Sequence, residues 1–132
     1  MGTLSEHRQK AASHSAFLEL IPDAYPDWLA TVAFYTAVEL LEMLFATRGH
    51  HSKSHFDRKQ ALRRYFPDRA LNRSFSDLYN ASLDGRYLAP QQAPTIEEVR
   101  QILVGRRLDM CANTWRPICR HSSWPTWAKT SC

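Results

Sequence analysis

The residues best suited to a chemical role are a run of cations between residues 48 and 73. Eight Lys or Arg side chains occur there against two Asp, so this segment carries a net charge of +6. Clustered cations bind phosphate groups, and a basic stripe is typical of a nucleic-acid-binding face. The segment therefore favours a phosphate-binding surface, while a solvated helix face with excess charge is the alternative. The eight cations are Arg48, Lys53, Arg58, Lys59, Arg63, Arg64, Arg69 and Arg73.

Histidine and cysteine spacing gives a weaker case for a metal site. His51 and His55 lie four residues apart, and Cys111, Cys119 and His121 could supply further ligands. Zinc sites usually contain two Cys separated by two residues, and this chain has no such pair. With only four glycines, it also has no glycine-rich phosphate loop. We therefore expect neither a metal ion nor another cofactor.

Length and composition are those of one globular domain. The chain has 132 residues, of which 44% are hydrophobic and 23% charged. The three cysteines all fall within the last 22 residues, which favours reduced thiols and a cytoplasmic location over a disulfide framework. The longest apolar stretch, residues 28–46, contains Glu39 and Glu42, and two carboxylates near the middle of a bilayer would be costly. We therefore expect a buried helix and no membrane span.

Helical periodicity over residues 1–112 predicts an all-α fold, an up-and-down bundle of four to five helices. Apolar spacing and flanking prolines place helices over about 5–20, 28–47, 55–66 and 71–85, with a last helix from residue 96. Asp27 is expected to cap the second helix, and Thr95 with Glu98 forms a capping box for the last. No segment alternates apolar and polar residues for long enough to predict a strand.

The residue pattern of two helices predicts which of their faces is buried. The second is apolar around most of its circumference, as in the central helix of a bundle, and its polar stripe is formed by Tyr35, Glu39 and Glu42. The predicted core stripe of the last helix consists of Ile96, Val99, Leu103 and Met110.

Residues 113–132 differ from the rest of the chain. They contain Trp115, Trp124 and Trp127, two prolines, two cysteines and no acidic residue, without helical periodicity. The segment is either a tail that folds over the bundle through its indoles or an extension foreign to the domain. The second interpretation is favoured because the segment follows none of the local rules that the helices obey.

Several short patterns occur in a fixed order over roughly residues 10–110. They are Asp27-Trp28-Leu29, Phe34-Tyr35-Thr36-Ala37-Val38, His51-Ser52-Lys53-Ser54-His55-Phe56-Asp57-Arg58, Leu78-Tyr79-Asn80-Ala81-Ser82 and Arg86-Tyr87. Together they resemble small prokaryotic HEPN-domain proteins. The resemblance implies a helical bundle, frequent homodimerisation, and a role in toxin–antitoxin or defence systems, in which a nucleotidyltransferase-type protein can be the partner.

Many members of that family are metal-independent endoribonucleases with an Arg and a His separated by four to six residues. The His acts as general acid or base at the ribose 2′-hydroxyl, and the Arg stabilises the charge that develops on phosphorus. Arg48 and His55, with six residues between them, match this spacing. They straddle a loop, however, whereas the family motif lies in a later helix. Glu39 also departs from the family, because relatives often have His there.

The sequence therefore predicts an HEPN-like protein that associates with RNA or with a partner protein, and the alternative is a metal-independent endoribonuclease that uses Arg48 and His55. A role for His55 and Arg58 in hydrogen bonding to the fourth helix, through Asn80, Ser82 or Tyr87, is the structural alternative. The candidate RNA-binding or phosphate-binding residues are Arg58, Lys59, Arg63, Arg64 and Arg86.

Overall fold

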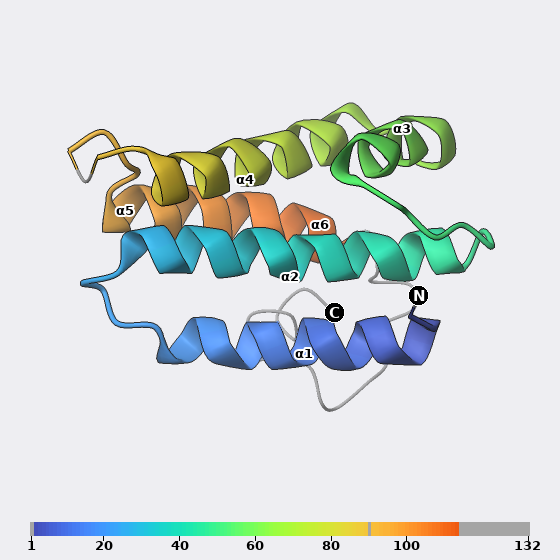
Figure 1. Cartoon of the computed structure of the whole chain (residues 1–132), viewed down its shortest axis with the longest axis horizontal. Coiled ribbons are helices and arrows are strands. Elements are labelled where there is room, and N and C mark those ends of the chain that lie inside the picture. Colours follow the sequence, from blue (N-terminus) through green and yellow to red (C-terminus); the bar gives the residue numbers. More distant parts are fainter. Residues whose placement is uncertain (1, 90, 114–132) are drawn as a thin grey trace.

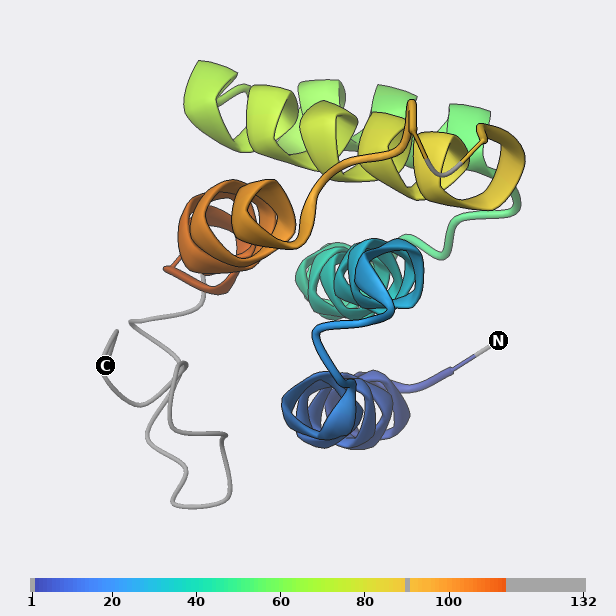
Figure 2. The ribbon, with the colours of Figure 1, turned by 90° about the vertical axis from the view of Figure 1, so that its left-hand side faces the viewer.

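The computed structural model describes residues 2–89 and 91–113, and this part of the chain contains helices and no strand (Figure 1). Helices α1, α2, α4 and the last helix run alternately up and down, and the short α3 packs beside α2 and α4 (Figures 1 and 2). The predicted all-α bundle is confirmed. The elements are α1 (Leu4–Leu20), α2 (Pro26–Ala46), α3 (His55–Tyr65), α4 (Arg69–Tyr87), α5 (Ile96–Glu98), η1 (Val99–Leu108) and α6 (Asp109–Asn113).

Helix α2 is the centre of the bundle, as predicted. It packs against α1, α4 and the last helix, and 15 of its 21 residues are buried. Its length and composition would allow it to cross a membrane, but a helix largely buried by its neighbours has the environment of a core helix. The prediction that Asp27 is the N-cap of α2 is wrong. Tyr25 is the N-cap and Pro26 the first helical residue, because the fixed φ of proline suits that position and its missing N–H leaves no bond unmade.

A loop over residues 47–54 connects α2 to α3. Gly49 has a φ of 69°, a conformation that side chains disfavour, and it ends α2 as predicted. The backbone N–H of Asp57 then donates to the Ser54 hydroxyl at 3.1 Å, which caps α3. Because α3 buries only Ala61 and Leu62 completely, most of its side chains are left for other contacts.

Helix α4 continues through Gly85 to Tyr87, slightly beyond the predicted break. The glycine is required by packing, since a Cβ at position 85 would lie 3.1 Å from the Cα of Asp27. Because glycine has no Cβ, the end of α4 can lie directly against the start of α2. Asp68 caps the other end of α4 by accepting the N–H groups of Ala70 and Leu71 at 2.8 and 3.2 Å.

The last helix opens with the predicted capping box, in which Thr95 N–H donates to Glu98 at 2.9 Å and Glu98 N–H to Thr95 at 3.3 Å. It then widens into a π-helix over Val99–Leu108, which the sequence did not predict. Val99 and Leu103 are buried as expected, but Leu108 rather than Met110 continues the core stripe, because i→i+5 bonding rotates later residues onto a different face.

The helix that follows ends at Asn113, so the predicted tail lies outside the described residues apart from that one position. Immediately before it, Cys111 is completely enclosed, and burial raises the pKa of its thiol to about 12. Cys111 is thus a small core residue rather than a reactive thiol.

Candidate nucleic-acid interface

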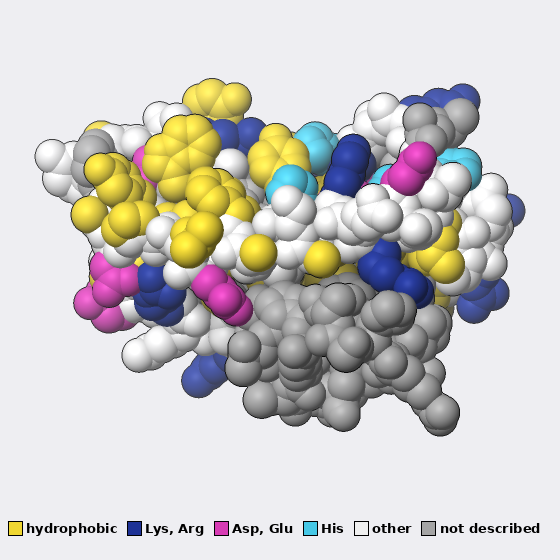
Figure 3. Space-filling model, turned by 90° about the horizontal axis from the view of Figure 1, so that it is seen from below, with side chains coloured by type: hydrophobic (Ala, Val, Ile, Leu, Met, Phe, Trp, Pro, Cys, Tyr) yellow, Lys and Arg dark blue, Asp and Glu magenta, His cyan; other side chains and the backbone are white. Residues whose placement is uncertain are grey.

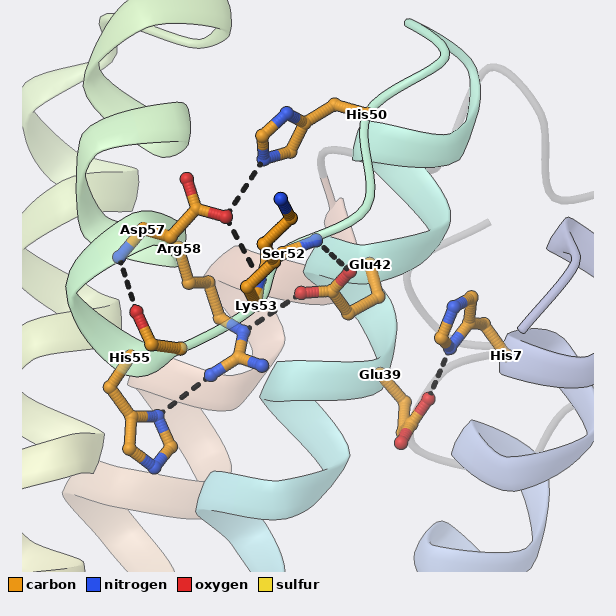
Figure 4. A network of polar contacts seen from close by, with 10 residues as sticks. His7, Glu39, Glu42, His50, Ser52, Lys53, His55, Asp57 and Arg58 are labelled. Carbon is orange, nitrogen blue, oxygen red and sulfur yellow. Dashed lines mark hydrogen bonds and ion pairs between the residues drawn. The ribbon is translucent and has the colours of Figure 1, made fainter. Parts of the chain in front are cut away.

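A buried ion pair fixes the start of α3 to the central helix (Figure 4). The Arg58 Nε donates to a Glu42 carboxylate oxygen at 2.9 Å, and their side chains are only 12% and 7% exposed. The other Glu42 oxygen accepts the Ser52 backbone N–H at 3.4 Å. Glu42 therefore belongs to the interior and not to an exposed polar stripe. Arg58, one of the predicted phosphate-binding residues, has its guanidinium committed to this carboxylate.

His55 lies next to that pair and is held as a neutral hydrogen-bond donor. Arg58 Nη1 donates to the His55 Nδ1 at 2.7 Å, and since a guanidinium can only donate, Nδ1 must accept and the ring proton lies on Nε2. The imidazole also packs against the rings of Phe34 and Tyr79, at centroid distances of 5.5 and 5.3 Å. The hydrogen bonds to α4 expected as the structural role of His55 and Arg58 are thus not the contacts found. His55 instead packs against the Tyr79 ring of α4, and Arg58 bonds to Glu42 of α2.

The electrostatic surroundings of His55 keep it uncharged. Burial of the ring lowers its pKa below the usual value of 6.5, and the positive charges of Arg58, Arg86 and Lys59 lower it further. Three cations therefore lie around an imidazole that is itself neutral. Because Arg58 is already paired with Glu42, an anion here would be bound by Arg86, Lys59 and the Nε2–H donor.

Replacing Arg86 by Gln tests this arrangement of charges. Loss of a nearby positive charge stabilises protonated imidazole, so the pKa of His55 should rise towards 6.5, although burial and the other two cations keep it below that value. Proton–nitrogen NMR titration of the histidine rings measures the change. The exposed Lys10 on α1 provides a matched control, because Lys10→Gln should leave the His55 pKa unchanged. A His55 pKa that is equal in Arg86→Gln and the parent protein would contradict the assignment.

Beyond His55, α3 and α4 form a groove with cations on both walls. Lys59 and Arg63 come from α3 and Arg69 and Arg73 from α4, around a volume of about 270 Å³ that is also lined by Asn72 and Ser76. We call the groove lined by these four cations the basic groove. Arg63 and Arg69 have no carboxylate partner among the described residues, and Arg73 has only a 4.0 Å contact with Asp77, which lies closer to Arg107 at 3.0 Å. Most of the positive charge of the groove is therefore not neutralised.

The remaining predicted residues lie apart from the groove. Arg64 stacks on Tyr65, with its guanidinium carbon 5.4 Å from the ring centroid, and Arg86 lies near the end of α4. Arg48 stacks on Phe66 at 5.5 Å, just beyond the end of α3, whereas His55 is the first residue of that helix. The length of α3, about 16 Å at 1.5 Å per residue, separates these two contacts. The structure does not bring Arg48 and His55 together, and their catalytic pairing stays a prediction.

A second carboxylate contact, between His7 and Glu39, has no signal in the sequence. His7 Nδ1 lies 2.6 Å from a Glu39 oxygen, which ties α1 to α2 (Figure 4). An imidazole is therefore present beside Glu39, although it comes from another helix. Within residues 2–89 and 91–113, no three His, Cys, Asp or Glu side chains gather closely enough to hold a metal ion.

Another exposed surface is apolar. Hydrophobic side chains gather at one end of the face shown in Figure 3, where α1 meets α2. Contiguous apolar surface of this kind is typical of protein interfaces. The dimer itself stays a prediction. The patch is formed by Phe17, Leu20, Tyr25 and Trp28 around a shallow hollow that reaches Ile21 and Val32.

Comparison with known proteins gives this chain no relative: no family model matches it, and neither does any curated protein or solved structure.

Proposed function

We propose that this protein is a non-catalytic RNA-associated module that binds the phosphate backbone in the basic groove. The observation that carries the proposal is the convergence of Lys59, Arg63, Arg69 and Arg73 from two helices on one groove. Cations without acidic partners attract phosphates most strongly, because no internal ion pair has to be broken first. Asn72 and Ser76 add neutral hydrogen-bonding groups, which commonly contact phosphate and sugar oxygens.

The choice of RNA among phosphate polymers rests on the resemblance to HEPN-domain proteins. By the same resemblance, the biological setting would be a toxin–antitoxin or defence system. The geometry around His55 favours binding over catalysis. A general base needs a free lone pair, but the Nδ1 lone pair accepts the Arg58 hydrogen bond and Nε2 carries the proton.

The proposal predicts that RNA affinity falls steeply with salt and depends on the groove. Arg63→Ala combined with Arg69→Ala should weaken binding of a fluorescent 20-nucleotide RNA measured by anisotropy. Each phosphate contact on a single strand contributes about 0.7 to the slope of log affinity against log salt, so loss of two should reduce the slope by about 1.4. Lys10→Ala combined with Arg106→Ala removes the same charge from exposed positions on α1 and η1, and it should change the affinity much less.

The same samples decide among the alternatives. Equal weakening in the two double variants would mean that only net charge matters, and the groove assignment would be wrong. Absence of RNA binding would remove the proposal altogether and leave a protein partner, such as a nucleotidyltransferase, as the expected ligand. RNA cleavage in EDTA that is lost in both Arg48→Ala and His55→Ala would instead establish the endoribonuclease.

A further inference from the structure

Exposed aromatic side chains occur beside Arg86 and His55, towards the other end of α4 from the arginines of the basic groove. Tyr87 is 77% exposed and Tyr35 38% exposed, and both contact Arg86. Arg86 Nη1 lies 3.3 Å from the Tyr35 hydroxyl, and its guanidinium carbon lies 5.6 Å from the centre of the Tyr87 ring. Phe56, which follows His55 at the start of α3, is 71% exposed. We call Tyr35, His55, Phe56, Arg86 and Tyr87 the aromatic corner.

The cation in this corner is positioned by neutral partners only. Arg86 Nε donates to the Ser82 backbone oxygen at 3.1 Å, and Nη2 lies 3.4 Å from the Ser82 hydroxyl. No carboxylate pairs with Arg86 in the described ranges. Its charge therefore remains available to an anionic ligand, and its guanidinium lies near the exposed Tyr87 ring and the Tyr35 hydroxyl.

A chain of contacts joins the corner to the basic groove. Lys59, on the wall of the groove, places its ammonium 4.5 Å from the centre of the Tyr79 ring. The Tyr79 ring in turn packs against His55 at 5.3 Å. Along α4, Arg69 in the groove and Arg86 in the corner are separated by 17 residues, about 25 Å of helix. Lys59, Tyr79 and His55 thus connect the basic groove to the aromatic corner, while the stretch of α4 between Arg73 and Arg86 has Asp77 and Asp84 and no cation.

We propose that the aromatic corner stacks unpaired bases, and that the ligand of this protein is single-stranded RNA. This inference rests on the proposed function, because it takes the groove as the phosphate site. Bases stack on exposed aromatic and guanidinium planes whatever their sequence, and cations then follow the backbone. Paired bases in a duplex are stacked on one another and cannot reach Tyr87 or Phe56. The corner therefore makes the protein prefer single strands without selecting a sequence.

The test compares a 12-nucleotide oligouridine with an RNA duplex of the same length by fluorescence anisotropy. The parent protein should bind the single strand at least about tenfold more tightly, and Tyr87→Ala and Phe56→Ala should each lose about tenfold on the single strand. Duplex affinity should barely change in either variant. Tyr87→Phe keeps the ring and should keep the affinity. Phe17→Ala removes another half-exposed ring, on α1, and should have no effect.

The outcomes separate this inference from the proposed function. If the corner variants bind oligouridine like the parent protein while the Arg63/Arg69 double variant binds weakly, the groove stands and the stacking site is wrong. If duplex and single strand bind equally, the inference is also wrong. If Tyr87→Ala and Phe56→Ala change the sedimenting mass but not RNA affinity, the corner is a protein interface. If the groove variants bind RNA normally, the proposed function itself fails.

Discussion

Arg58→Ala should destabilise the protein by about 3–5 kcal/mol, a large part of the stability of a domain of this size. The substitution leaves the Glu42 carboxylate in the interior, where it is 7% exposed and has lost the guanidinium that lay 2.9 Å away. An unpaired buried charge costs far more than a surface ion pair contributes. Urea denaturation followed by circular dichroism at 222 nm measures the free energy of unfolding directly, because the described chain is helical.

Two comparisons separate the ion pair from a general loss of charge. Lys59→Ala, one residue along α3, removes the same charge from a side chain in the groove and should cost at most about 1 kcal/mol, through its contact with the Tyr79 ring. Replacing both partners, Glu42→Leu with Arg58→Met, should recover most of the loss because neither charge is then left alone. If Arg58→Ala were as stable as Lys59→Ala, the pair would be shown not to hold α3 in place.

Phe34→Ala should also cost about 3–5 kcal/mol, through loss of buried area and the cavity that remains. Phe34 on α2 is completely buried and is the ring that the neighbouring aromatic groups share. Its centroid lies 5.6 Å from that of Phe75, 5.4 Å from Tyr79 and 5.5 Å from His55. Removing it therefore withdraws packing from α2, α4 and the start of α3 together. Thermal and urea unfolding provide the measurement.

Exposed aromatic residues supply the control for this substitution. Phe17→Ala changes the same side chain at a half-exposed position and should cost well under 1 kcal/mol. Phe34→Leu retains much of the buried volume and should fall between the two. A small loss for Phe34→Ala, equal to that of Phe17→Ala, would contradict the packing of this cluster.

Local sequence signals were sufficient for most of the helices. Pro22, Pro67 and the Thr95 capping box mark boundaries through backbone constraints that act within a few residues. Apolar periodicity likewise identified α2 as the central helix, since its residues are buried on most sides. The π-helix could not be predicted in this way, because i→i+5 bonding is rare and carries no sequence pattern of its own.

The candidate site was predicted only in part, because its contacts join distant positions. Charge counting found the basic segment, but only tertiary packing separates Arg58, which is paired with Glu42, from its neighbour Lys59 in the groove. Arg69 and Arg73 belonged to that segment and were not singled out, since their place opposite α3 depends on how α3 and α4 meet. The motif spacing of Arg48 and His55 carried no information about where the two side chains lie, near opposite ends of α3.

The light anchoring of α3 has a thermodynamic consequence. This helix buries only two residues completely and is fixed at its start by one ion pair, yet it supplies one wall of the basic groove. Its local opening therefore costs less free energy than unfolding of the bundle. A polyanion that bridges α3 and α4 binds the closed arrangement and not the open one, so occupancy and closure reinforce each other by linkage. Ligand in hundredfold excess over its dissociation constant would add about 2.7 kcal/mol to the closed state.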